Sequence, residues 1–171
     1  MSPANIILTG FMGTGKSTIG RALAARLGAT FIDTDQLIEK RNNCRITDIF
    51  GRQGEAAFRR MEADLAPELA AQRDQVIATG GGFFTNPENI RVLQQTGRIL
   101  CLTAAPKEIF NRVKKQGGTR PLLQHPDPLE QINQLLRERE PIYRQFLQIS
   151  TSGQTIDQVV DTIINLLTPD S

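Results

Sequence analysis

The sequence of 171 residues lacks several features on which whole classes of protein depend. Its only cysteines, Cys44 and Cys101, and its one histidine, His125, form no metal-binding or redox spacing. We expect His125 to lie on the surface and Cys101, which sits in an apolar run, to be a core residue. No apolar stretch is long enough to span a membrane, and none has the pattern of a secretory signal. These absences favour a cytoplasmic protein without membrane contact.

Charge of one sign is also scarce. The formal net charge is +2, from 20 Lys and Arg against 18 Asp and Glu, so the pI near 8.7 does not indicate nucleic-acid binding. Fifteen of the basic residues are arginines, which suit bidentate recognition of carboxylates and phosphates and so favour anionic ligands. No repeat, linker or low-complexity tract divides the chain. We therefore expect a single domain over residues 1–171 and a monomer.

A glycine-rich loop is the most informative feature that the chain does contain. Residues 10–17 read Gly-Phe-Met-Gly-Thr-Gly-Lys-Ser and fill each fixed position of the phosphate-binding pattern G-x-x-x-x-G-K-[ST]. Residues 5–9 form a short apolar run typical of a buried strand, and apolar residues at helical spacing follow from about Lys16. This order of strand, loop and helix favours a nucleotide site over a glycine-rich turn without a ligand.

The loop predicts contacts to the phosphates of a nucleotide and to Mg²⁺. Its glycines allow consecutive N–H groups to point at phosphate oxygens, and the helix dipole adds to that attraction. Lys16 is expected to reach the β- and γ-phosphates, while the Ser17 hydroxyl binds a Mg²⁺ ion that bridges them. The nucleotide-binding residues expected here are Gly13, Thr14, Gly15, Lys16, Ser17 and Thr18.

Strand and helix patterns alternate along the rest of the chain. Apolar runs predict four further strands, at residues 29–32, 76–78, 99–102 and 148–150. Helical periodicity fills the segments between them, although Pro67 is expected to kink its helix or to start a new one. The alternation predicts an α/β three-layer sandwich, with a five-stranded, mainly parallel sheet flanked by helices. The glycine-rich loop after the first strand makes this a sheet of the P-loop NTPase type. Residues 116–127, with two glycines and two prolines, predict a mobile lid over about residues 112–127.

Ligands of such a sheet bind at the carboxyl ends of its strands. Asp33 and Asp35 close the second strand, where one carboxylate could join the Mg²⁺ shell and the other could orient and deprotonate an acceptor hydroxyl. Either could instead cap a helix that begins near Gln36. The glycine triplet at residues 80–82 closes the third strand. It could let backbone amides approach a ligand, or it could form an irregular turn.

Several arginines add a second chemical theme. Arg59 and Glu62 are spaced i and i+3 on a helix, which by itself indicates a solvated salt bridge. Together with Arg120 and Arg139, however, Arg59 favours an anionic acceptor and a charge-neutralising lid. Arg120 lies in the glycine-containing loop, which could deliver it to a transferring phosphoryl group and exclude water.

Taken in order, these motifs resemble the shikimate kinase family over about residues 5–167. The resemblance implies ATP-dependent transfer of the γ-phosphoryl group to the 3-hydroxyl of shikimate, with Mg²⁺, giving shikimate 3-phosphate and ADP in the chorismate pathway to aromatic amino acids. The motifs that carry it are the loop at 10–18, Asp33-Thr34-Asp35, residues 49–50 and 54–62, the triplet at 80–82, Arg120-Pro121-Leu122-Leu123 and residues 139–143.

The resemblance also implies a role for each site residue. Shikimate is bound through an acceptor segment at about residues 34–62 and through later residues. The expected roles are catalysis by Lys16, Asp35 and Arg120; Mg²⁺ binding by Ser17 and Asp33; shikimate binding by Asp35, Arg59, Gly80, Gly81, Gly82 and Arg139; orientation of Arg59 by Glu62; and nucleotide binding by Arg112 and Arg120. Arg112 is expected on the adenine side of the nucleotide.

Two other hypotheses remain open. The chain could be a P-loop kinase for a nucleoside monophosphate or another sugar acid such as gluconate, although the paired aspartates, Arg59 and Arg139 match a carboxylate-bearing polyol better. It could also bind nucleotide without catalysis and signal through its lid to a partner. The joint presence of Lys16, Asp33, Asp35 and Arg120 disfavours that class.

Overall fold

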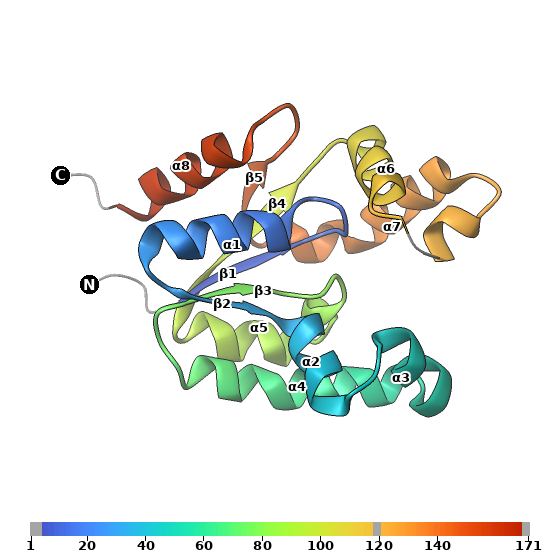
Figure 1. Ribbon diagram of the computed structural model, residues 1–171, viewed down its shortest axis with the longest axis horizontal. Helices are drawn as coiled ribbons and strands as arrows, with labels where there is room; N and C mark the ends of the chain where they lie inside the picture. The colour runs from blue at the N-terminus through green and yellow to red at the C-terminus, as the bar shows by residue number, and fades with distance from the viewer. Residues whose placement is uncertain (1–4, 118–120, 169–171) are drawn as a thin grey trace.

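The computed structural model describes residues 5–117 and 121–168, and these form a three-layer α/β sandwich around one parallel sheet (Figure 1). Within this part of the chain the sheet has five strands in the order β2-β3-β1-β4-β5. The strands are β1 (Asn5–Gly10), β2 (Thr30–Asp33), β3 (Gln75–Ala78), β4 (Gly97–Thr103) and β5 (Leu147–Ser150). All five predicted strands are confirmed to within about two residues, and every pairing is parallel rather than mainly so.

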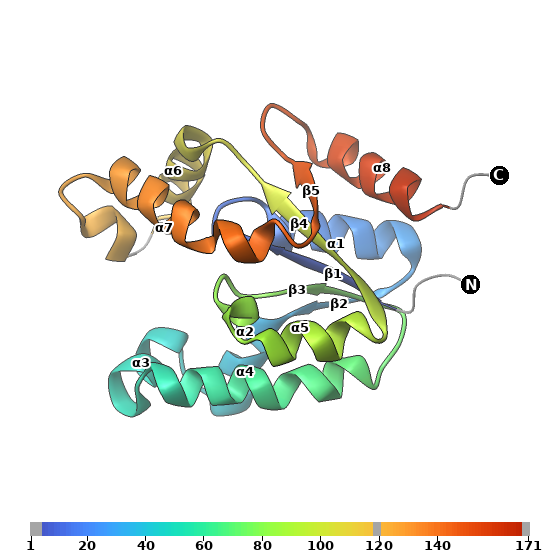
Figure 2. The same ribbon diagram turned by 180° about the vertical axis from the view of Figure 1, so that it is seen from behind.

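The described residues also form eight α-helices and two short 3-10 helices. They are α1 (Lys16–Leu27), α2 (Thr34–Asn42), α3 (Ile46–Gln53), α4 (Glu55–Ala70), η1 (Phe83–Thr85), α5 (Pro87–Gln94), α6 (Pro106–Lys115), η2 (Pro121–Gln124), α7 (Pro128–Tyr143) and α8 (Ile156–Leu167). Helices α1 and α8 lie on one face of the sheet, and α4 and α5 lie on the other, as both views show (Figures 1 and 2). No helix in the described part of the chain is long and apolar enough to cross a membrane.

The sheet is buried on both faces because side chains alternate along each strand. In β1, Ile6 and Leu8 belong to the core under α1 and α8, whereas Ile7 belongs to the core on the opposite face. Cys101 of β4 is fully buried in that second core, which confirms its predicted place. Since β1 is the central strand and both of its faces are covered, the loop that follows it starts from a fixed position.

Pro67 does not start a new helix, and α4 continues through it to Ala70. A new helix at Pro67 is therefore the wrong alternative, and contacts with distant residues hold the last turn of α4 in place. Leu69 is buried, and its carbonyl accepts hydrogen bonds from the side-chain amide of Gln75 at 3.2 Å and from the side-chain amide of Asn5 at 3.5 Å. The Asn5 amide also donates to the Gln72 carbonyl at 2.8 Å. These bonds anchor the end of α4, which follows a residue that cannot donate a helical hydrogen bond.

Candidate active site

The ends of the three neighbouring strands β2, β3 and β1 bring the predicted site residues to one edge of the sheet. The phosphate loop follows β1, Asp33 ends β2, and the glycine triplet follows β3. The residues that the structure describes line two cavities there: one of about 360 Å³ beside the phosphate loop and α6, and one of about 220 Å³ between the loop, α4 and α7. We refer to them as the nucleotide cavity and the acceptor cavity.

The backbone of the phosphate loop takes conformations that need glycine. Gly15, the residue before α1, has φ 99° and ψ 18°, so its missing Cβ allows the loop to enter the helix in a left-handed conformation. The Thr14 hydroxyl is buried and donates to the Phe11 carbonyl at 2.7 Å. The Lys16 ammonium donates to the carbonyls of Gly10 and Phe11 at 2.6 and 2.9 Å. The lysine therefore lies along the loop, within it rather than out in solvent.

Ser17 and Asp33 meet where the predicted metal site should be. The Ser17 hydroxyl donates to Asp33 Oδ2 at 2.6 Å, and Asp33 Oδ1 accepts from the Gln36 amide at 3.1 Å. Asp33 is thus the N-cap of α2, which begins at Thr34 rather than near Gln36, and Asp35 is not a cap. One aspartate oxygen caps the helix while the other faces the loop, so the capping and metal hypotheses are compatible for this residue.

This pair fits a magnesium ion better than a metal bound by the protein alone. A hydroxyl and a carboxylate are the hard oxygen ligands that Mg²⁺ prefers, and Mg²⁺ usually takes its other ligands from phosphates and water. Among the described residues no group of three or more His, Cys, Asp or Glu side chains could hold a metal. The donor set therefore suits an ion that arrives with a nucleotide.

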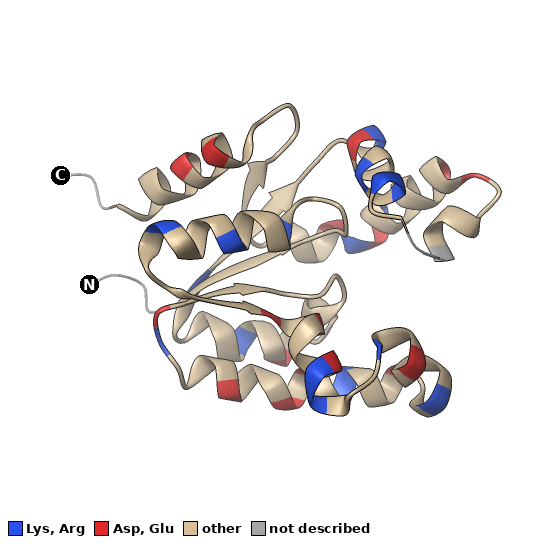
Figure 3. Ribbon diagram, in the orientation of Figure 1, with Lys and Arg blue, Asp and Glu red and all other residues tan. Residues whose placement is uncertain are grey.

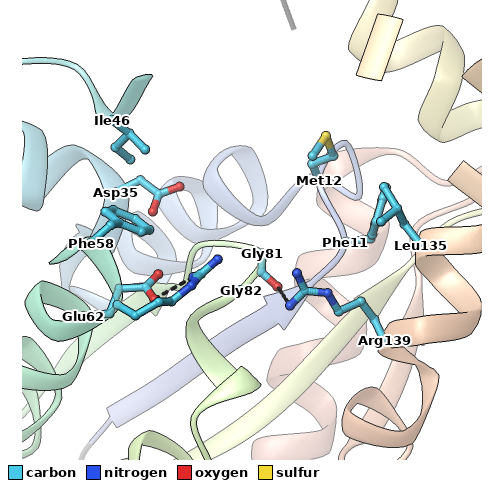
Figure 4. Close-up of a pocket in the computed structure, with 11 residues that line it drawn as sticks. Phe11, Met12, Asp35, Ile46, Phe58, Glu62, Gly81, Gly82, Leu135 and Arg139 are labelled. Atoms are coloured by element: carbon cyan, nitrogen blue, oxygen red, sulfur yellow. Dashed lines mark hydrogen bonds and ion pairs between the residues drawn. The ribbon is translucent and has the colours of Figure 1, made fainter. Parts of the chain in front are cut away.

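Asp35 lies in the first turn of α2 and points into the acceptor cavity (Figure 4). Its Oδ1 atom is buried and has no hydrogen-bond partner. Burial, together with the nearby negative charge of Asp33, raises the pKa of Asp35 from 3.8 to about 6, although Lys16 acts in the opposite direction. A carboxylate with a pKa of about 6 can accept a proton near neutral pH, as a general base must.

The glycine triplet serves the neighbouring side chains as well as the cavity. A Cβ on Gly80 would collide with the Asp35 carboxylate, and one on Gly82 would collide with the Arg59 guanidinium. The Gly80 amide does not face a ligand, because it donates to the buried Thr34 hydroxyl at 2.9 Å. Around Gly81, by contrast, an added Cβ meets no atom within 4 Å, so this residue borders open cavity.

Arg59 and Glu62 form a salt bridge that is largely buried, whereas their spacing by itself indicates a solvated pair. Glu62 is 1% exposed, and its Oε2 accepts from the Arg59 guanidinium at 2.7 Å. Its Oε1 is buried without a hydrogen-bond partner. Burial raises the pKa of Glu62 to about 7 against the opposing effect of Arg59. Glu55 holds the other side of the guanidinium at 3.3 Å, so two carboxylates fix its orientation.

Arg139 reaches the same cavity from α7. Its guanidinium donates to the Gly81 carbonyl at 3.2 Å, and the buried Tyr143 hydroxyl donates to the same oxygen at 3.3 Å. Figure 4 shows Asp35 and Glu62 on one side of the cavity and Arg139 on the other, with Gly81 between them. Two carboxylates with raised pKa values line the cavity, and one of them, Glu62, is paired with Arg59. The Asp35 carboxylate and the two guanidiniums therefore face the same ligand space.

Apolar side chains that the sequence did not single out complete the wall of the acceptor cavity. Phe58 lies under the Arg59 guanidinium, with the ring centroid 5.4 Å from its central carbon. No local signal in the sequence marks these residues, since an apolar side chain next to a motif is usually core. They are Phe11, Met12, Ile46, Phe58 and Leu135.

Arg112 of α6 lines the nucleotide cavity. Its guanidinium donates to the Gly13 carbonyl at 3.1 Å, and to the hydroxyl and carbonyl of Thr151 at 2.9 and 3.1 Å. Glu108, one turn earlier on α6, accepts from it at 3.0 Å. Basic residues gather in the last turn of this helix, which Figure 3 shows as a blue cluster on α6. The arginine thus links α6, the phosphate loop and the segment after β5.

Two residues of the expected lid have different outcomes. Arg120 lies outside the described residues, so its role stays a prediction. His125 is exposed, and its Nδ1 lies 3.1 Å from the Asp127 amide, which confirms that it is a surface residue.

A phosphate loop, a Ser–Asp pair whose oxygens suit Mg²⁺, and a second cavity lined by Asp35 and two arginines are the features of a P-loop kinase that phosphorylates a small molecule. A family model described as "Shikimate kinase" matches residues 12–168. The chain belongs to the shikimate kinase family.

Individual relatives agree with this assignment. A shikimate kinase from Thermus thermophilus is 46% identical over 167 residues, which cover 96% of this chain and 91% of the relative. A structure of shikimate kinase from Acinetobacter baumannii in complex with shikimate is 36% identical, with a TM-score of 0.86, and covers 95% of this chain and 92% of that one. A gluconokinase from Sinorhizobium meliloti, 18% identical with a TM-score of 0.59 over 96% of this chain and 94% of that one, shares the fold alone.

Proposed function

We propose that this protein is a shikimate kinase, which transfers the γ-phosphoryl group of ATP to the 3-hydroxyl of shikimate. The observation that carries the proposal is the meeting of Asp35, Arg59 and Arg139 in one cavity beside the phosphate loop. Shikimate has one carboxylate and several hydroxyls, so it can pair with the guanidiniums at one end and with Asp35 at the other. The similarity to a shikimate-bound kinase supports the same choice of acceptor.

Lys16, Ser17 and Asp33 prepare the donor side of the reaction. We propose that the Lys16 ammonium exchanges its loop carbonyls for the β- and γ-phosphate oxygens, where it offsets charge that develops during transfer. Ser17 and Asp33 would hold Mg²⁺, which would supply positive charge to offset the negative charge of the phosphates. Arg120, from the lid, would add a further positive charge at the transferring group.

Asp35 prepares the acceptor side. It would accept a hydrogen bond from the 3-hydroxyl, align that oxygen with the γ-phosphorus and take its proton as the new bond forms. Arg59 and Arg139 would fix the opposite end of the molecule through its carboxylate, and Glu62 keeps Arg59 aimed into the cavity. Gly81 would supply backbone contact to shikimate. Most of the catalytic effect in this scheme comes from positioning and charge, as expected for phosphoryl transfer.

The remaining parts of the proposal concern organisation. Residues 34–62 would form the acceptor-binding segment and residues 112–127 the lid of one domain. The protein would act as a monomer in the cytoplasm. Its two cysteines, Cys44 and Cys101, form no disulfide, which suits a reducing compartment.

A coupled ADP-release assay with shikimate, gluconate and AMP as separate acceptors tests the function. We expect ATP turnover to be stimulated strongly by shikimate and little by the other two. Stimulation by gluconate or AMP instead would move the protein to another kinase class. Intact ADP binding with no stimulation by any acceptor would favour a nucleotide-binding module without catalysis.

A further inference from the structure

We infer that Thr151 is a positioning residue of the phosphate loop: its buried hydroxyl holds the Thr14–Gly15 peptide so that the Gly15 N–H faces the nucleotide phosphates. The inference rests on the proposed function only in taking a nucleotide as the ligand of this loop. Thr151 follows the last residue of β5 and is 4% exposed. Its backbone amide donates to the Thr103 carbonyl at 2.8 Å, which extends the pairing of β4 with β5 by one residue.

The Thr151 hydroxyl connects three parts of the chain. It lies 2.9 Å from the Thr14 carbonyl and 3.0 Å from the Thr103 carbonyl, and it accepts from the Arg112 guanidinium at 2.9 Å. A hydroxyl has a single proton to donate. The Thr14 carbonyl is the nearer of the two, and the Thr103 carbonyl already accepts one hydrogen bond from the backbone amide of Thr151, so we assign the proton to the Thr14 carbonyl.

Geometry carries this bond from the carbonyl of Thr14 to the amide of Gly15. A trans peptide is planar, so its C=O and N–H groups point in opposite directions. Fixing the Thr14 carbonyl toward Thr151 therefore turns the Gly15 N–H away from Thr151, toward the inner side of the loop. In a loop of this pattern, that is the side on which backbone amides meet phosphate oxygens.

The conformation of Gly15 leaves the peptide before it with little restraint of its own. A glycine with φ 99° has no Cβ to restrict rotation of the peptide before it. The preceding carbonyl, that of Gly13, accepts from Arg112 at 3.1 Å, and Arg112 is itself held by Thr151 and Glu108. Two successive peptides in the middle of the loop are thus held from outside by one connected group of side chains.

The test compares Thr151→Val, which keeps the shape and removes the hydroxyl, with Thr151→Ser, which keeps the hydroxyl. The binding of ADP and of tripolyphosphate, which has phosphates and no base, is measured by calorimetry. We expect Thr151→Val to weaken both ligands about three- to tenfold, because the hydroxyl that holds the Thr14 carbonyl, and that also accepts from Arg112, is lost. Thr151→Ser should restore most of the affinity. Thr162→Val, on the exposed side of α8, is the matched control and should leave both affinities unchanged.

The KM for shikimate should stay the same in Thr151→Val, since the acceptor cavity does not include this residue. Unchanged affinity for ADP and tripolyphosphate would overturn the inference. Weaker ADP binding with unchanged tripolyphosphate binding would also overturn it, because it would show a contact with the base instead. If thermal melting shows that Thr151→Val does not fold, Thr151→Cys replaces it, because a thiol has a similar size and is a weak donor. An ADP affinity of Thr151→Cys at least about twofold below that of Thr151→Ser would support the inference, and equal affinities of these two variants would contradict it. A wild-type protein that binds ADP but does not phosphorylate shikimate would refute the proposed function while leaving this binding test intact.

Discussion

Asp35 should reduce the stability of the folded protein at neutral pH, and Asp35→Asn should recover that stability. The carboxyl group has its pKa raised from 3.8 to about 6, mainly by burial, so the folded state prefers the protonated form. Ionising it at neutral pH costs about 3 kcal/mol relative to the unfolded chain. Asparagine has nearly the same shape and carries no charge, so the variant avoids this cost.

The sign and the pH range follow from the same values. Below about pH 4, Asp35 is protonated in the folded and the unfolded states. The free energies of unfolding of the wild type and of Asp35→Asn should therefore vary with pH in nearly the same way. Between about pH 4 and pH 6 the unfolded wild-type chain loses this proton while the folded chain keeps it, so wild-type stability falls as pH rises. Asp35→Asn does not lose this contribution. Its advantage should therefore grow through this range and level off above it.

Urea unfolding at a series of pH values measures the difference. We expect Asp35→Asn to be more stable by up to about 3 kcal/mol at pH 7, or about 6 to 12 °C in melting temperature for a chain of this size. The same variant should lose at least about 100-fold in turnover with little change in ADP affinity. Asp64→Asn, an exposed position on α4, makes the same chemical change outside the site and serves as control. A stability difference for Asp35→Asn that does not vary with pH would refute the reasoning.

Three further predictions concern the same site. Arg59→Ala leaves Glu62 buried without its partner, so the free energy of unfolding in urea should fall by about 2 kcal/mol. The double variant Arg59→Ala/Glu62→Gln should recover most of this loss, and equal stability of the single and double variants would contradict the reasoning. Gly80→Ala places a methyl group against the Asp35 carboxylate, so the melting temperature of this variant should fall by several degrees, roughly as for other overpacked sites. Gly81→Ala, whose methyl group meets no neighbour, should melt at the wild-type temperature. Ser17→Ala should lower Mg²⁺-dependent turnover about 100-fold and leave ADP affinity in EDTA nearly unchanged; a parallel loss of both would assign Ser17 to the loop structure instead.

The sequence predicts those parts of the fold that local patterns determine. Each strand is a short apolar run between turn residues, and the glycine loop after β1 has a fixed pattern, so both could be placed from neighbouring residues alone. The division of work between Asp33 and Asp35 could not be settled in this way. It depends on whether α2 begins at Thr34 or two residues later, which is within the usual error of a helix boundary.

Contacts between distant segments account for what the sequence does not predict. The spacing of Arg59 and Glu62 indicates a pair on one helix face, but only the packing of α4 against the cavity buries Glu62. Gly80 must lack a side chain because Asp35, which is far away in the sequence, lies against it. Thr151 similarly meets the phosphate loop only because β5 and β1 both flank β4. Such constraints arise from the sheet order, which no single segment encodes.

The pairing of the acceptor's carboxylate with the arginines of the acceptor cavity is the central claim, and one comparison of substrates tests it most directly. The value of kcat/KM is measured for shikimate and for its neutral methyl ester, with the wild-type protein and with Arg139→Ala. Arg139 suits this test because its side chain is only partly buried. We predict that the wild type prefers shikimate at least about tenfold, and that Arg139→Ala loses most of this preference because one charge-assisted contact is gone. Equal turnover of acid and ester by the wild type, or a preference that Arg139→Ala leaves unchanged, would contradict the account.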